Sequence, residues 1–172
     1  MNRILVSACL IGHPVRYNGV SVECHHPILQ KWLAEGRVVP VCPEVAGGMP
    51  NARLPAEIAG GHGGVAVWQD NARVIDSSKK DITAEFVAGA RLAAKLAIEN
   101  GIRVAILKEG SPSCGVNYTY DGTFSHRRIS AAGVTAEYLR RSGIQIFSET
   151  QIDEANLVLE RLDGESSGES SK

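Results

Sequence analysis

Three of the four cysteines in this chain follow short apolar segments that have the composition of buried β-strands. They are Cys9 after residues 4–8, Cys42 after residues 38–41, and Cys114 after residues 104–108 and a Ser-Pro-Ser turn. In an open α/β sheet the carboxyl ends of parallel strands share one edge, and ligands bind in the crevice there. Three thiolates in one crevice would hold a metal ion or an iron–sulfur cluster with one coordination position open for chemistry.

Polar residues at the same strand ends could take part in that chemistry. Glu44 follows Cys42 by two residues and could serve as a general acid or base, although a loop or helix-capping carboxylate has the same sequence signature. Ser111 could donate or relay a proton, or could only satisfy backbone groups in its turn. Lys108 could hold an anion, and Glu149 follows the fourth expected strand, where a solvated role is the simpler expectation.

The fourth cysteine has a different setting. Cys24 lies in an expected loop as Cys24-His25-His26 and could be a fourth ligand, in which case zinc would suit the mixed cysteine and histidine set. The chain has no paired C-x-x-C, which argues against a structural zinc ribbon. Three functions therefore remain open: an iron–sulfur enzyme, a thiolate-zinc hydrolase using three thiolates or two plus a histidine, and a non-enzymatic iron–sulfur or redox-sensing module.

The elements that must position these residues alternate along the chain. Expected strands cover residues 3–8, 37–41, 102–108 and 144–147, and expected helices cover residues 27–35, 83–100, 134–142 and 151–162. Such alternation indicates βαβ units with right-handed crossovers. We therefore predict an α/β, Rossmann-like fold with a mostly parallel sheet flanked by helices.

The remaining segments are expected outside that sheet. Residues 42–64 are rich in glycine and proline, and a loop of this length is uncommon unless it is functional or mobile. Residues 65–68 and 72–75 read as a small hairpin excursion, and residues 109–131 read as loop. The division expected from these patterns is one α/β domain over residues 1–162, which carries the cysteine site, and a disordered polar tail over residues 163–172.

Composition narrows the functional classes. Eighteen basic and 19 acidic residues give a net charge of -1, so a nucleic-acid partner is not expected. No apolar run reaches the roughly 18 residues that a membrane helix needs. With no recognisable export signal, the expected location is cytoplasmic, where clustered cysteines more often indicate metal binding or catalysis than disulfides.

Several motifs, in order along the chain, resemble one known bacterial family. They are residues 7–10 (SACL), 16–19 (RYNG), 39–48 (VPVCPEVAGG), Arg53, Pro55, 105–115 (AILKEGSPSCG), 120–124 (YDGTF), 133–136 (GVTA) and 148–149 (SE). Together they are similar to a domain-of-unknown-function family that includes the 2-thiouracil desulfidases. The segments around Cys42 and Cys114 are the most specific part of this resemblance.

The resemblance implies a [4Fe–4S] cluster held by Cys9, Cys42 and Cys114, with an unligated fourth iron that takes the sulfur of a small thiolated substrate. It also implies an acid/base role for Glu44 and a catalytic role for Ser111. The activity expected from it is a non-redox desulfidase that removes sulfur from a thiolated pyrimidine.

Two positions depart from the family pattern. Val15 stands where many members have a further cysteine, and Asn18 stands where an aspartate is usual. The set of three thiols needs neither residue, and the second change is small within a turn.

Overall fold

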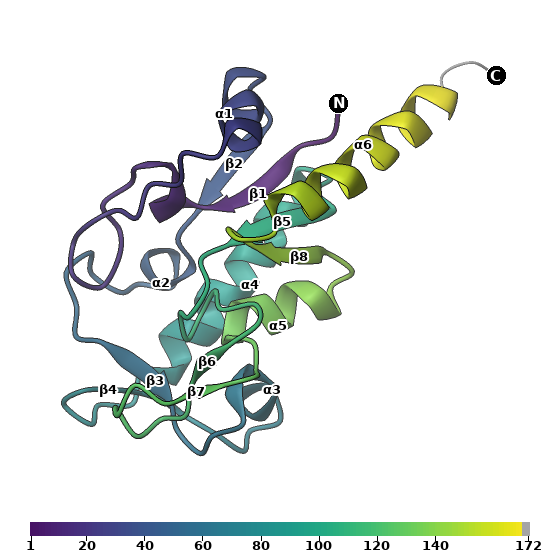
Figure 1. Ribbon diagram of the computed structural model, residues 1–172. Coiled ribbons are helices and arrows are strands. Elements are labelled where there is room, and N and C mark those ends of the chain that lie inside the picture. The colour runs from purple at the N-terminus through teal and green to yellow at the C-terminus, as the bar shows by residue number, and fades with distance from the viewer. Residues whose placement is uncertain (170–172) are drawn as a thin grey trace.

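The computed structural model describes residues 1–169, and its centre is a four-stranded parallel sheet in the order β2-β1-β5-β8 (Figure 1). The strands are β1 (Ile4–Ser7), β2 (Val38–Val41), β5 (Val104–Leu107) and β8 (Gln145–Ser148). Every residue of β1 and β5 is buried, because these two central strands are covered on both faces. The predicted α/β class with a parallel sheet is confirmed.

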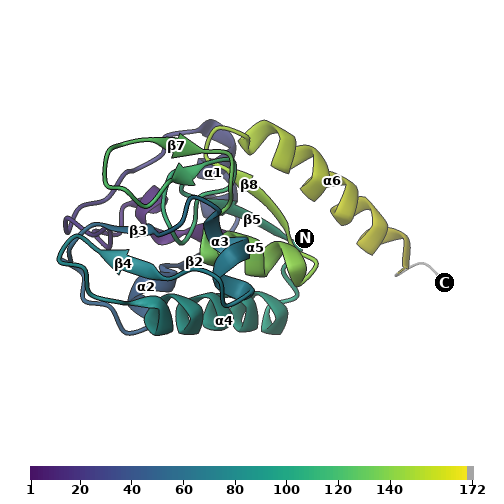
Figure 2. The ribbon, with the colours of Figure 1, turned by 90° about the horizontal axis from the view of Figure 1, so that it is seen from below.

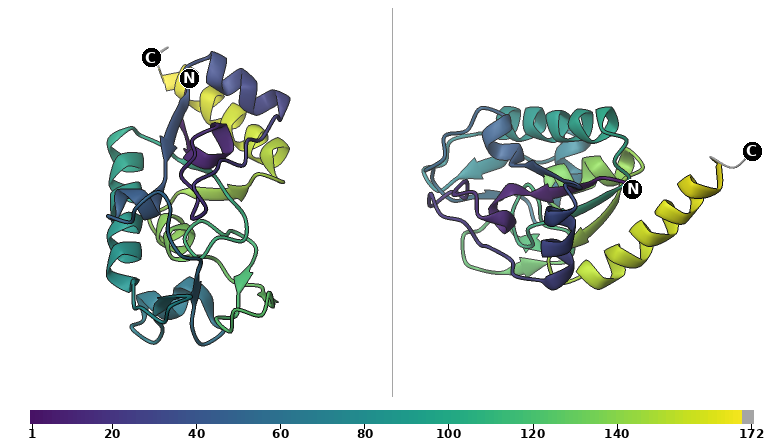
Figure 3. Two further views of the ribbon diagram at one scale, coloured as in Figure 1. Left: turned by 90° about the vertical axis from the view of Figure 1, so that its left-hand side faces the viewer. Right: turned by 90° about the horizontal axis from the view of Figure 1, so that it is seen from above.

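Helices cover the two faces of the sheet in two pairs (Figure 3). One face packs against α1 (Pro27–Ala34) and α6 (Ile152–Glu169), and the other against α4 (Thr83–Glu99) and α5 (Val134–Arg141). Side chains alternate between these faces, so that Val6 belongs to the first core and its neighbour Leu5 to the second. The result is a three-layer α/β/α arrangement.

The hairpin excursion exists, but it uses different residues from those expected. Residues 65–68 belong to α3 (Gly63–Trp68), while β4 (Val74–Asp76) pairs antiparallel with β3 (Ala56–Ile58) from the expected loop. Packing outweighs the local strand propensity, because Trp68 stacks on Tyr138 and its ring nitrogen donates to the carbonyl of Val134.

A second small hairpin interrupts the other expected loop. It joins β6 (Thr119–Tyr120) to β7 (Arg128–Ile129). Figure 2 shows both hairpins on the same side of the molecule, away from the long helix α6. Two short helical segments complete the fold: a 3-10 turn, η1 (Ala8–Ile11), directly after β1, and α2 (Pro43–Ala46), directly after β2.

The C-terminal helix is longer than the sequence predicted. Helix α6 continues through residues 163–169, which were expected to begin a disordered tail; residues 170–172 lie outside the described part of the chain. Asp163 ties the helix to the body, since its carboxylate accepts hydrogen bonds from the Asn2 backbone and from Arg37. The predicted helix end at residue 162 is therefore wrong, because the contacts of Asp163 join residues that are far apart in the sequence. Within residues 1–169, no helix is long and apolar enough to cross a membrane.

Candidate active site

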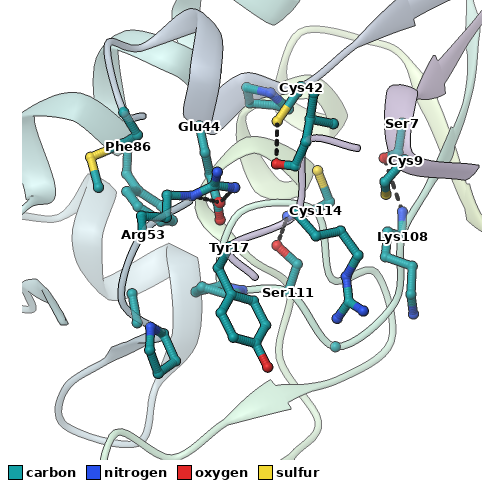
Figure 4. A pocket seen from close by; sticks show the side chains of 18 of the residues that line it. Ser7, Cys9, Tyr17, Cys42, Glu44, Arg53, Phe86, Lys108, Ser111 and Cys114 are labelled. Atoms are coloured by element: carbon teal, nitrogen blue, oxygen red, sulfur yellow. Dashed lines mark hydrogen bonds and ion pairs between the residues drawn. The ribbon is translucent and has the colours of Figure 1, made fainter. Parts of the chain in front are cut away.

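The three cysteines that follow β1, β2 and β5 line one cavity of about 320 Å³. Figure 4 shows Cys9, Cys42 and Cys114 gathered around it, with Glu44 and Ser111 nearby. Because β2, β1 and β5 are neighbours in a parallel sheet, their carboxyl ends bring together residues far apart in sequence. The predicted convergence at this edge is confirmed, while the role of the three thiols as ligands stays a prediction.

Burial sets the ionisation of these thiols. It raises the pKa of Cys9 to about 11, with the nearby Arg16 charge opposing the shift. Burial also raises the pKa of Cys42 and of Cys114, and the Ser7 hydroxyl opposes the shift at Cys114 through a hydrogen bond. These environments favour neutral thiols, and a bound metal cation would reverse that preference because a coordinating thiol is deprotonated.

The three thiols do not form a ready site for a single metal ion. Within the described chain, no three histidine, cysteine, aspartate or glutamate side chains come close enough to hold one metal ion. A tetrahedral zinc site needs sulfur atoms at about 2.3 Å from a common centre. The cavity therefore brings three thiols together without arranging them as a tetrahedral single-ion site.

Glu44 projects from α2, the short helix whose N-cap position is occupied by Cys42. Its carboxylate is largely buried and pairs with Arg53, whose Nε and Nη2 both donate to Oε2. The Nε to Oε2 distance is 2.7 Å. The structure therefore places Glu44 in the cavity wall as one half of an ion pair.

Ser111 begins the turn that carries Cys114. Its Oγ accepts hydrogen bonds from the backbone N–H groups of Ser113 and Cys114, each at 3.0 Å. A hydroxyl that accepts two bonds through its lone pairs keeps its own proton available as a donor. Ser111 thus satisfies backbone groups in its turn, and its role as a proton donor stays a prediction.

Lys108 and Glu149 form an ion pair at the same sheet edge. The Lys108 ammonium lies 2.7 Å from Glu149 Oε1 and donates to the carbonyl of Glu109, while Glu149 Oε2 accepts the Glu109 backbone N–H. Glu149 is mostly buried rather than solvated as expected. The Glu149 carboxylate thereby neutralises the Lys108 charge inside the protein. The pair also holds the backbone of Glu109, at the start of the loop that carries Ser111.

Of the remaining residues discussed from the sequence, Val15 lines the cavity, whereas Cys24 and Asn18 do not. Cys24 is outside the cavity, packed against the core beneath α1 and α6. Val15, at the position of the frequent family cysteine, does line the cavity, and its carbonyl is 3.7 Å from the Cys42 sulfur. Asn18 forms an isolated bridge with Ala52 and accepts the Val20 N–H in its turn.

Two contributors to the cavity had no role assigned from the sequence. Arg53 and Ser7 appeared only as parts of family motifs. Ser7 is buried, its Oγ accepts the Lys108 backbone N–H at 3.0 Å, and its hydrogen bond to Cys114 opposes the rise in the pKa of that thiol. No spacing rule links residues 7 and 114 or 44 and 53, so these pairings required the tertiary structure.

Comparisons with known proteins identify relatives of this chain. A family model described as 2-thiouracil desulfurase matches residues 4–151. Uncharacterized protein YbbK of Bacillus subtilis (strain 168) is 39% identical over 151 residues, which are 88% of this chain and 98% of YbbK. A solved structure of the [4Fe-4S]-dependent thiouracil desulfidase TudS (DUF523Vcz) matches with a TM-score of 0.84 and 47% identity, over 93% of this chain and 99% of that chain. On this evidence the chain belongs to the 2-thiouracil desulfurase family.

Proposed function

We propose that this protein is an iron–sulfur desulfidase that removes sulfur from a thiolated pyrimidine such as 2-thiouracil. The observation that carries the proposal is one cavity lined by Cys9, Cys42, Cys114, Glu44 and Ser111. Family membership supports it, as does the likeness to a [4Fe-4S]-dependent thiouracil desulfidase at 47% identity.

The donor set fits a [4Fe–4S] cluster held at three corners. Cys9, Cys42 and Cys114 are three thiols from three neighbouring strand ends that line one cavity. A fourth thiol is absent from this cavity wall, because Cys24 lies elsewhere. When bound, the cluster would supply a thiophilic, Lewis-acidic iron for the sulfur of a thiocarbonyl group.

Glu44 supplies the acid/base group. Its Oε2 is occupied by Arg53, which leaves Oε1 to accept a proton from a water molecule as that water attacks the thiocarbonyl carbon. Ser111 supplies a proton donor, since its Oγ already accepts two backbone hydrogen bonds. The overall change consumes one water, replaces C=S by C=O and releases hydrogen sulfide, with no net electron transfer.

The rest of the cavity suits a small aromatic substrate. Its wall includes apolar and aromatic side chains, among them Tyr17, Met49 and Phe86. Such surfaces contact the faces of a flat heterocycle, while a few polar groups orient it. A thiolated pyrimidine has both features, because its ring is planar and its nitrogen and oxygen atoms form hydrogen bonds.

The test is anaerobic purification followed by measurement of iron, acid-labile sulfide and visible absorption, and then of sulfide and uracil release from 2-thiouracil. We expect about four irons per chain and equal amounts of the two products. A colourless protein with one bound zinc would support the thiolate-zinc hydrolase instead. A full cluster with no sulfide released from a panel of thiolated pyrimidines would support a non-enzymatic iron–sulfur module.

A further inference from the structure

The guanidinium of Arg53 points into the protein rather than toward a ligand. Its side chain is 5% exposed, although the residue lies in the wall of the cavity. Nη1 donates to the carbonyls of Pro50 at 3.0 Å and Asn51 at 2.9 Å, while Nε and Nη2 donate to Glu44. Four of its five N–H groups are thus engaged with protein groups, which argues against substrate binding as the main role of Arg53.

The two donors to Glu44 converge on a single oxygen. Both end on Oε2, whereas an arginine commonly grips both oxygens of a carboxylate with two parallel bonds. The Glu44 side chain is 13% exposed, so the carboxylate keeps access to the cavity. Within the described chain, Arg53 therefore holds Oε2, and Oε1 accepts no hydrogen bond.

Arg53 also connects Glu44 to a second part of the cavity wall. Its backbone N–H donates to the carbonyl of Tyr17 at 2.7 Å, next to the bridge between Asn18 and Ala52. Helix α2 has only four residues, so its own hydrogen bonds hold Glu44 weakly. The arginine supplies an anchor from outside the helix.

We propose that Arg53 is the positioning residue for Glu44: it selects which carboxylate oxygen faces the substrate and fixes that oxygen against the Tyr17 segment. The proposal rests on the proposed desulfidase activity. It assigns Arg53 an effect on turnover through Glu44 and none through substrate contact.

The test is a double-mutant cycle of Arg53→Gln and Glu44→Gln, measured as kcat and KM for 2-thiouracil with iron content determined for every variant. Arg53→Gln should lower kcat by about 10- to 100-fold, the range for a misplaced catalytic group, with KM changed less than about threefold. In the Glu44→Gln background the same substitution should change kcat less than about threefold, because its only route of action is already removed.

Two further variants keep the result interpretable. Arg53→Lys retains the charge, but one ammonium cannot serve both Glu44 and the loop carbonyls, so it should retain an intermediate kcat. Arg73→Gln, an exposed arginine paired with Asp70 and Asp81, is the matched control and should leave kcat unchanged. If Arg53→Gln fails to fold, the cycle is run with Arg53→Lys.

The outcomes separate this proposal from the proposed function. Additive losses in the double variant, or a rise in KM as large as the fall in kcat, would overturn the positioning role while wild-type desulfuration stands. A wild-type protein that holds a full cluster and releases no sulfide would overturn the proposed function and this inference together.

Discussion

Gly89 in helix α4 lies directly beneath the backbone of Pro43 in helix α2, and a β-carbon on Gly89 would overlap the Pro43 carbonyl. The contact is reciprocal, since a β-carbon on Gly47 would overlap the carbonyl of Glu85 in α4. Two glycines thus let α2 rest on α4 at backbone distance. Because α2 follows Cys42 and contains Glu44, this crossing sets the depth of both residues in the cavity.

We predict that Gly89→Ala displaces α2, lowering both iron content and desulfuration. In an unobstructed helix interior, alanine is more favourable than glycine by about 1 kcal/mol. At Gly89 the steric overlap should reverse that sign, as measured by urea denaturation. Gly164→Ala in α6 is the matched control, because its added methyl group meets nothing within 4 Å, and it should be neutral or stabilising. Normal iron content with raised stability in Gly89→Ala would contradict the proposed role of the crossing.

We predict that Cys42→Ser abolishes stable cluster binding, as should the same change at Cys9 or Cys114, because a site of three thiols has no redundant ligand. Iron and acid-labile sulfide analysis after anaerobic reconstitution measures this. Cys24→Ser is the control and should retain the wild-type amounts, since Cys24 lies outside the cavity. Equal iron in the wild type and Cys42→Ser would refute the ligand set.

We predict that Glu44→Gln keeps the cluster but slows desulfuration by about 10²-fold or more, the range of a positioned acid/base group. The substitution preserves shape and removes the proton-accepting charge. Ser111→Ala should likewise spare the cluster and slow turnover. Single-turnover sulfide release with matched iron content is the measurement. Loss of the cluster in Glu44→Gln would instead make Glu44 a ligand or a structural support.

We predict that the metal-free protein loses stability as the pH rises from about 9 to about 11. The Cys9 thiol has a folded-state pKa of about 11 against 9.0 for an ordinary cysteine, so in this window the unfolded chain releases a proton that the folded chain retains. Stability therefore falls with pH, by up to about 2–3 kcal/mol from Cys9 alone. The raised pKa values of Cys42 and Cys114 act in the same direction.

Urea denaturation of the metal-free protein across this pH range measures the effect. Cys9→Ala should flatten the curve, since it removes one of the groups that titrate. A pH dependence as steep in Cys9→Ala as in the wild type would assign the alkaline loss of stability to other groups.

Local patterns were sufficient for the architecture. Short, mainly apolar segments predicted all four strands of the parallel sheet, and apolar spacing together with helix-end signals predicted α1, α4, α5 and the first part of α6. A parallel strand that is buried on both faces consists mainly of apolar residues. A helix that covers a sheet has apolar residues at regular helical spacing. Both patterns can be recognised in the sequence. Three cysteines at strand ends then predicted a shared site, because parallel strands present their carboxyl ends at one edge.

Contacts between distant segments decided the rest. Residues 65–68, expected as a strand, form part of α3, because Trp68 stacks on Tyr138 and donates to the Val134 carbonyl. Helix α6 extends beyond residue 162, because Asp163 accepts hydrogen bonds from Asn2 and Arg37. The sequence by itself determined the sheet, its helices and which thiols could meet. Only the tertiary structure decided how the site is held, through Arg53 on Glu44 and Gly89 beneath Pro43. The physical reason is that hydrogen bonds and close backbone approach depend on three-dimensional position, which has no period along the chain.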